Sequence, residues 1–390
     1  MKKIKSFILA TMAFALVAPM FTACSSDGDE PAETKDEVIN NIISEYSVND
    51  KIVADQKKAS GNDEAVLLVA FGSTWNNAFL AFDQTKKAYQ AAFPKADIYV
   101  SFSSDICINR ASVGENKDDD GNIVKRDYYE PRYLLHAIGA AKYSKIYVQS
   151  LQVIPGEEFA AVVASVKKFM NNGYIASAHL DDAYLAKLAD KKAIFLGMPL
   201  LDNPEVDVPR VAQELDKLYA SEAAQGAVAF MGHGNPDKYD TFKANERYKQ
   251  LETELQKLNS NYFVGTVDMK DNFKQDVMVR MQGKGFDNSN GKDKVFLHAL
   301  MSIAGDHAHN DMAGVGEDYW DAEDPESEDN SWYEFFQYNG YEPIVPKTNN
   351  HPLGLLELEG IQQVWIDHTL NADFLEDAYH SMYPEEEEEE

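Results

Sequence analysis

Two series of apolar segments, each closed by a glycine or a polar turn, occur in the same order in the two halves of this 390-residue chain. The first series reads AVLLVAFGS, DIYVSFSSD and KIYVQSLQVIPGEE, beginning at residues 65, 97 and 145. The second reads GAVAFMGHG, NYFVGTVDM and KVFLHALMSIAGDH, beginning at residues 226, 261 and 294. A continuous apolar run that ends in glycine is typical of a parallel strand covered by helices on both faces. The repeat therefore predicts an α/β protein with two parallel sheets related by internal duplication.

The segments between these strands have helical periodicity, and right-handed crossovers place such helices on both faces of each sheet. We predict an N-terminal α/β domain over residues 61–221 and a C-terminal α/β domain over residues 222–384. Residues 24–60 are expected to form a polar tether and one helix, and residues 385–390 an acidic tail. Because α/β folds bind ligands outside the carboxyl ends of their strands, we expect the ligand site between the two domains.

The chain is strongly acidic, with a formal net charge of −29 and a sequence pI near 4.6. A surface of this sign repels phosphate backbones and anionic lipid headgroups. We therefore expect no nucleic-acid partner. Part of the excess lies in local acidic runs, which are typical of solvated loops and tails.

Residues 1–23 have the pattern of an export signal, because a basic start and a short apolar run precede Ala23 and Cys24. Small residues directly before a cysteine resemble the bacterial lipoprotein signal, in which Cys24 is lipidated and becomes the mature N-terminus. We expect an exported protein, periplasmic or at the outer membrane, that is held to the membrane only by this lipid anchor. A plain secretory signal with an incidental Cys24 is the alternative.

Three strands of the second series end in side chains that bind divalent metals, namely His233, Asp268 and His307. Adjacent parallel strands lie about 5 Å apart, so ligands at equivalent strand ends converge. Two imidazoles and one carboxylate with open positions suit Co²⁺, Fe²⁺, Ni²⁺ or Zn²⁺. For His233 alone, the flanking glycines equally suit a histidine in a tight turn before a helix. The predicted metal site therefore depends on all three residues together.

In the first series the equivalent positions are Ser73, Ser104 and Glu158, of which only Glu158 is a strong metal ligand. If the two domains face each other, Glu158 completes the site from across the cleft. A glutamate at a helix start is also favoured by the helix dipole, so a structural role stays open. We expect His309 and Asp311 to orient the two imidazoles.

Other residues have less specific interpretations. His298 lies within an apolar strand segment and is expected to be a core histidine with a satisfied hydrogen bond. Trp75 follows a predicted strand end, where it meets either a flat ligand or the core. The chain contains no P-loop, no dinucleotide-binding glycine motif and no nucleophile elbow.

The segments LLVAFGST, QSLQVIPGEE, FMGHG and AGDHAHNDM, in this order, resemble the anaerobic (class II) sirohydrochlorin cobaltochelatase family over residues 65–369. The resemblance implies two flavodoxin-like domains of the type II chelatases, with a cleft for a tetrapyrrole. It implies that His233, His307 and Asp268 bind the metal, although the family has glutamate at the third position. It also points to Glu158 as a catalytic residue.

The activity that the resemblance implies is that of a lyase that inserts Co²⁺, or Fe²⁺, into sirohydrochlorin with loss of two pyrrole protons. His233 is then a metal ligand and the proton acceptor, a role that suits an imidazole because its usual pKa is near neutrality. The alternative is a non-enzymatic lipoprotein that binds haem, a corrinoid or a metal ion during uptake. The expected partners are therefore a tetrapyrrole and a divalent metal, and assembly into a homo-oligomer stays open.

Overall fold

The computed structural model describes residues 35–114, 122–173, 179–240, 243–289, 291–327 and 329–375. The chain divides into two compact units, residues 1–41 and residues 42–390, and the second unit carries both sheets. The predicted export signal, Cys24 and the acidic tail lie outside the described residues. Among the helices of the described part, none is both long and apolar enough to cross a bilayer.

The first sheet has five strands in the order β2-β1-β3-β4-β9. The parallel strands are β1 (Glu64–Ala70), β2 (Ala96–Phe102), β3 (Lys145–Ser150) and β4 (Ile194–Gly197), and β9 (Asp373–Phe374) is antiparallel. Leu67 and Leu68 are neighbours that point to opposite faces of β1, and both are fully buried. The sheet is therefore covered on both faces, as the continuous apolar run predicts.

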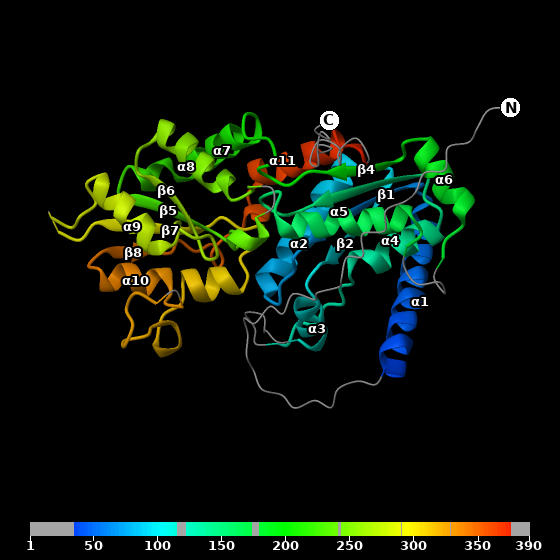
Figure 1. The fold of residues 1–390 in the computed structure, drawn as a ribbon, viewed down its shortest axis with the longest axis horizontal. Helices are drawn as coiled ribbons and strands as arrows, with labels where there is room; N and C mark the ends of the chain where they lie inside the picture. Colours follow the sequence, from blue (N-terminus) through cyan, green and yellow to red (C-terminus); the bar gives the residue numbers. More distant parts are fainter. Residues whose placement is uncertain are drawn as a thin grey trace, which may run out of the picture. The chain divides into compact units, whose positions relative to one another are not determined.

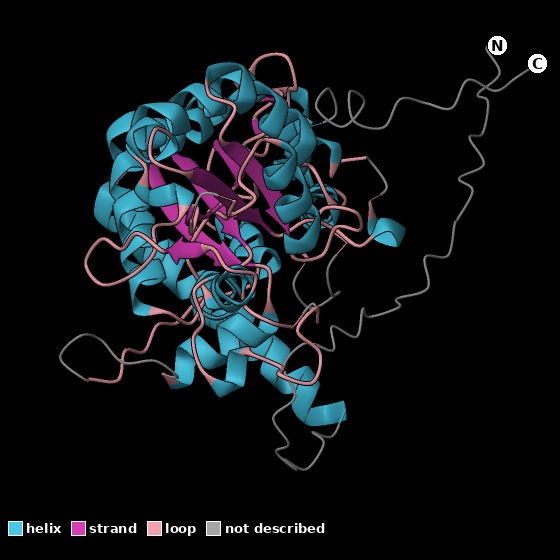
Figure 2. Cartoon of the chain, turned by 90° about the vertical axis from the view of Figure 1, so that its left-hand side faces the viewer, coloured by secondary structure: helices cyan, strands magenta, loops and turns pink. Residues whose placement is uncertain are grey.

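Helices form the layers on both sides of the first sheet (Figures 1 and 2). One face packs against α1 (Lys35–Ser60), α4 (Pro131–Ala140), α5 (Glu157–Met170) and α6 (Asp182–Asp190). The opposite face packs against α2 (Asn76–Ala92) and α11 (Glu359–Leu370). The short helix α3 (Asp105–Val113) follows the carboxyl end of β2.

The second sheet has four parallel strands in the order β6-β5-β7-β8. They are β5 (Ala227–Gly232), β6 (Tyr262–Thr266), β7 (Lys294–Ala299) and β8 (Glu342–Ile344). One face packs against α7 (Asp207–Ala223) and α8 (Glu246–Leu258), and the other against α9 (Lys274–Gly283) and α10 (Trp332–Tyr338). Numbered within each half, the four parallel strands of both sheets have the same order, 2-1-3-4. The α/β fold with duplicated parallel sheets is confirmed.

The end of the chain returns to the first sheet. Helix α11 packs against β3, β4 and α7, and β9 pairs with β4 through Phe374 and Phe195. Two elements of the predicted C-terminal domain, residues 222–384, therefore pack with the first sheet, and the domain bounds themselves stay a prediction. The sequence could not show this, because an apolar helix face does not specify which of two similar sheets it covers.

His368, near the end of α11, gives a testable pH dependence of stability. Its Nδ1 donates to the Met198 carbonyl at 3.0 Å, and its Nε2 lies 3.0 Å from Asp207 Oδ1. Burial lowers the pKa of His368, but the hydrogen bond and charge of Asp207 outweigh burial, so the net shift of the pKa is upward. The folded state thus binds this proton more tightly, a contribution that is complete below the unfolded pKa of about 6.5 and lost as pH rises through the folded pKa.

We therefore expect His368→Gln to flatten the decrease in the free energy of unfolding that the wild-type protein shows as pH rises above about 6.5. Urea titrations at several pH values measure the decrease. The exposed His179 provides the matched control, His179→Gln, which should keep the wild-type slope. Equal slopes in the wild-type and His368→Gln proteins would contradict the assignment.

Candidate active site

The turn after β5 presents the imidazole of His233. A Cβ atom on the preceding Gly232 would lie 2.4 Å from Tyr248 Cε1, so only glycine fits there. Gly234 has a φ of +83°, in the left-handed region that favours glycine. His233 Nδ1 donates to the Gly234 carbonyl at 2.7 Å, because a carbonyl oxygen can only accept. The Nε2 lone pair is therefore left for a metal ion or a proton.

Asp268 is held beside His233 by the backbone. The Asp268 N–H donates to the His233 carbonyl at 2.9 Å, which joins the turn after β6 to the turn after β5. The Asp268 Oδ2 atom lies 3.5 Å from His233 Nε2. The two side chains are 45% and 39% exposed, so both reach the crevice at the strand ends. The structure thus brings together two of the predicted ligands.

His307 enters the same site from the chain that follows β7. It begins a π-helical turn, η3 (His307–Met312), a rare conformation that often occurs at functional sites. The ring centroids of His307 and His233 are 4.9 Å apart, at an interplanar angle of 78°. His307 Nδ1 hydrogen bonds with the carboxylate of Asp311, one turn later. As in His233, Nε2 is the nitrogen that remains for chemistry.

The charges around these imidazoles come from both halves of the chain. Glu158 is the second residue of α5, on the first sheet. Burial raises the pKa of Glu158, and the neighbouring His233 and His307 offset part of this rise. Burial lowers the pKa of His307, but the hydrogen bond to Asp311 and nearby carboxylates raise the pKa above its usual value. The backbone geometry agrees, because a Cβ atom on Gly156, directly before α5, would lie 2.4 Å from Asn235 Nδ2, two residues after His233.

In the described part of the chain, no three His, Cys, Asp or Glu side chains stand close enough together to hold a metal ion. Each imidazole is instead paired with a carboxylate, His233 with Asp268 and His307 with Asp311. The metal-binding set of His233, Asp268 and His307 therefore stays a prediction, supported by the proximity of its members.

Comparison with known proteins identifies the family. The family model described as cobalt chelatase (CbiK) matches residues 64–373, which include both sheets and all four predicted site residues. The chain belongs to the cobalt chelatase (CbiK) family.

Named relatives of this chelatase have related descriptions. It is 26% identical over 305 residues to sirohydrochlorin cobaltochelatase CbiKC from Nitratidesulfovibrio vulgaris, covering 78% of this chain and 89% of the relative. It is 26% identical over 258 residues to sirohydrochlorin cobaltochelatase from Salmonella typhimurium, covering 66% of this chain and 83% of the relative. Among solved structures, SirB from Bacillus subtilis with Fe³⁺ matches with a TM-score of 0.45 and 12% identity, covering 80% of this chain and 99% of SirB.

Around the chelatase site, the residues expected to support the imidazoles have different roles. Asp311 holds His307 as expected, whereas His309 stacks on Trp75, with ring centroids 3.7 Å apart. His298 is the expected core histidine, because its Nε2 lies 2.5 Å from Glu222 Oε2. The stacked pair leaves no signal in the sequence, since no local pattern links two residues so far apart in the chain.

Cys107, one of the two cysteines of the chain, lies in α3 beyond the carboxyl end of β2. It is half-buried in α3, and its backbone N–H donates to Ser104 Oγ at 3.3 Å. Burial raises the pKa of the Cys107 thiol, and the charges of Asp306 and Glu158 raise it further. The thiol is therefore held in its protonated form, which is a poor nucleophile and a poor metal ligand.

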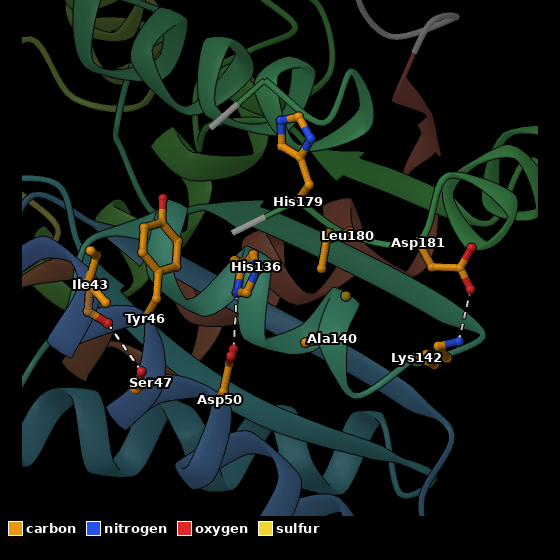
Figure 3. A pocket seen from close by; sticks show the side chains of 11 residues that line it. Ile43, Tyr46, Ser47, Asp50, His136, Ala140, Lys142, His179, Leu180 and Asp181 are labelled. Carbon is orange, nitrogen blue, oxygen red and sulfur yellow. Dashed lines mark hydrogen bonds and ion pairs between the residues drawn. The ribbon is translucent and has the colours of Figure 1, made fainter. Parts of the chain in front are cut away.

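A cavity of about 360 Å³ lies between α1, α4 and the loop before α6, and none of the predicted site residues lines it (Figure 3). His136 Nδ1 lies 3.0 Å from Asp50 Oδ1, and Lys142 Nζ lies 3.0 Å from Asp181 Oδ2. These charged groups thus already pair with one another. Because the cavity lies among helices and away from the strand ends, we place the active site at the strand ends instead.

Proposed function

We propose that this chelatase inserts Co²⁺ into sirohydrochlorin at the strand-end site. Two relatives that align over most of their length are named sirohydrochlorin cobaltochelatases. The observation that carries the proposal is the convergence of His233 and His307, 4.9 Å apart, beside the turn against which the start of α5 packs through Gly156 and Asn235. A site assembled from two facing halves suits a substrate that has to be held on both faces.

Insertion exchanges two pyrrole protons for one Co²⁺ ion, so the site has to deliver a dication and accept two protons. His233 and His307 offer their Nε2 lone pairs to Co²⁺, and the carboxylate of Asp268 balances part of its charge. As the pyrrole nitrogens replace the imidazoles around the ion, His233 Nε2 becomes free to accept one proton. Glu158 accepts the other. The overall charge is unchanged, because one Co²⁺ ion enters the macrocycle as two protons leave its pyrrole nitrogens. The protein returns to its starting state when the metallated macrocycle and both protons have left the site.

Turnover by the purified protein tests this function. Metal-free sirohydrochlorin and Co²⁺ are mixed with the protein, and the metallated product is followed by its absorption. We expect many product molecules per protein chain, at a rate well above that of the reaction without protein. Tight binding of the macrocycle without turnover would favour the carrier alternative and overturn the proposal. Parallel reactions with Fe²⁺, Ni²⁺ and Zn²⁺ rank the metals, and we expect Co²⁺ to be preferred.

We also propose that the protein is exported and anchored to a membrane through a lipid on Cys24. The basic start, the apolar run and the Ala23-Cys24 pair support this proposal. When the chain is expressed in a bacterium with labelled palmitate, the wild-type protein should carry the label and sediment with membranes. Cys24→Ser should lose both properties, whereas Cys107→Ser should keep them. An unlabelled wild-type protein would contradict the anchor.

A further inference from the structure

One aromatic contact joins the two halves of the chain at the edge of the active site. Trp75, in the loop between β1 and α2, stacks on His309 of η3 with ring centroids 3.7 Å apart and an interplanar angle of 10°. The Trp75 Nε1–H donates to the carboxylate of Asp306. His309 Nδ1 donates to the Gly305 carbonyl at 2.9 Å, which fixes the orientation of its ring. The pair thus connects the carboxyl-end loops of the two sheets.

The position of the pair relates it to the substrate. His309 lies two residues after His307, within the same π-helical turn. The loop after β1 reaches the same edge of the second sheet, because a Cβ atom on Gly305 would lie 3.2 Å from Ser73 Oγ. The two rings are nearly parallel with centroids 3.7 Å apart, so the indole presents a flat face of the kind that stacks on other flat ring systems.

The stack is not needed to hold the two loops together. Asn77 Nδ2 donates to the Ala304 carbonyl at 2.9 Å, and Ser302 Oγ donates to the Leu151 carbonyl at 2.5 Å. The first of these hydrogen bonds joins the segment that carries Trp75 to the segment that carries His309, and the second joins the latter to the loop after β3. Trp75 and His309 are both half-buried, unlike the fully buried aromatic side chains of the core. The stack can therefore open while the neighbouring contacts persist.

The surface beside Trp75 is apolar. Phe71, directly after β1, is 45% exposed, and Ile106, at the start of α3, is 47% exposed. Their backbones are close, because the Ser104 N–H donates to the Phe71 carbonyl at 3.0 Å. Both follow strands whose carboxyl ends lie at the edge of the sheet that carries Trp75. Exposed apolar side chains in this place suit the hydrophobic plane of a macrocycle.

We propose that the Trp75–His309 stack is a releasable clasp, in which Trp75 leaves His309 and stacks on the plane of the tetrapyrrole. Trp75 is then a positioning residue for the macrocycle, and His309 is its resting partner. This inference rests on the proposed chelatase function. The Trp75 indole is covered by His309 before the exchange and by the tetrapyrrole after it. The macrocycle is the larger of the two and covers more of the indole. His309 therefore competes with the substrate for the same ring.

The two members of the clasp should respond in opposite directions when they are replaced. We expect Trp75→Leu to raise the KM for sirohydrochlorin by about 5- to 10-fold, with kcat within about 2-fold of the wild-type value. Trp75→Phe should restore most of the affinity, because it keeps a flat ring. His309→Ala should leave KM unchanged or lower it, since it removes the competing partner. Trp320→Leu, which replaces another half-buried tryptophan, should leave KM unchanged.

A binding measurement adds a readout that does not depend on turnover. Metal-free sirohydrochlorin is titrated into each variant, and tryptophan fluorescence is followed together with macrocycle absorption. We expect part of the fluorescence change to be absent in Trp75→Phe, because Trp75 is the indole that changes its partner. Thermal unfolding identifies any variant that is poorly folded. If Trp75→Leu is such a variant, the KM values of Trp75→Phe and His309→Ala are compared instead to test the clasp.

Several outcomes would overturn the clasp. An unchanged KM in Trp75→Leu, or equal increases of KM in Trp75→Leu and His309→Ala, would show a purely structural contact and leave the chelatase function intact. A wild-type protein that neither binds nor metallates sirohydrochlorin would overturn both the proposed function and the clasp. The wild-type assay therefore separates the two failures.

Discussion

Replacement of His233 by alanine is expected to lower kcat/KM for Co²⁺ insertion into sirohydrochlorin by at least about 100-fold. The side chain has two roles in the proposed reaction, because its Nε2 atom binds Co²⁺ and later accepts a pyrrole proton. Neither described neighbour is expected to replace it in both roles. The carboxylate of Asp268 lies 3.5 Å away from the position of this nitrogen, and the His307 ring is held in its own orientation by Asp311. Initial rates at several concentrations of Co²⁺ and macrocycle measure the loss.

The control for this prediction uses the exposed His179, which lies outside the site. His179→Ala should keep wild-type kinetics and so exclude a general effect of removing an imidazole. Equilibrium binding of Co²⁺, followed by the absorption of the bound ion, should weaken by about 10- to 100-fold in His233→Ala and remain unchanged in His179→Ala. A folded His233→Ala protein whose rate is within 2-fold of wild type would exclude His233 from the mechanism.

Replacement of Trp365 by alanine is expected to lower the free energy of unfolding by about 3–5 kcal/mol. Trp365 is fully buried in α11, among residues of the first sheet, and its Nε1–H donates to the Gln152 carbonyl at 3.3 Å. Removal of the indole leaves a large cavity between α11 and the sheet. Urea-induced unfolding followed by circular dichroism measures the change.

Trp320 provides the matched comparison, because it is half-buried and its ring meets Tyr338 at a centroid distance of 4.9 Å. Trp320→Ala should cost only about 1 kcal/mol, as is usual for a side chain outside the core. Equal losses in the two variants would mean that α11 contributes no more to stability than a surface loop. Such a result would contradict the role of α11 as a layer of the first sheet.

Much of the fold could be predicted because parallel strands buried on both faces leave a clear signal. The run around Leu67 and Leu68 is apolar at consecutive positions, since both faces of β1 are covered. The return of α11 and β9 to the first sheet could not be predicted, since the choice between two similar sheets depends on tertiary packing. The π-helical turn at His307 was equally hidden, because local preferences do not distinguish it from an ordinary helix start.

The part of the site that could be predicted from the sequence is the set of residues that follow the ends of neighbouring strands. His233, Asp268 and His307 stand at equivalent ends of adjacent strands, and the structure brings the first two within 3.5 Å and the two imidazole rings within 4.9 Å of each other. Glu158 was placed by the alignment of the two halves. The contact of Trp75 with His309 depends instead on how one half meets the other, which no local pattern encodes.

The pairing of β9 with β4 also sets the order in which the polypeptide can mature. A ribosome releases the strands β1 to β4 early, but the edge strand that completes their sheet is made last. The first half therefore remains unfinished until nearly the whole chain has been synthesised, although domains usually fold as units as they emerge. If the protein is exported as proposed, such a delay favours passage through a translocation channel, because the first sheet is completed only after β9 has been made.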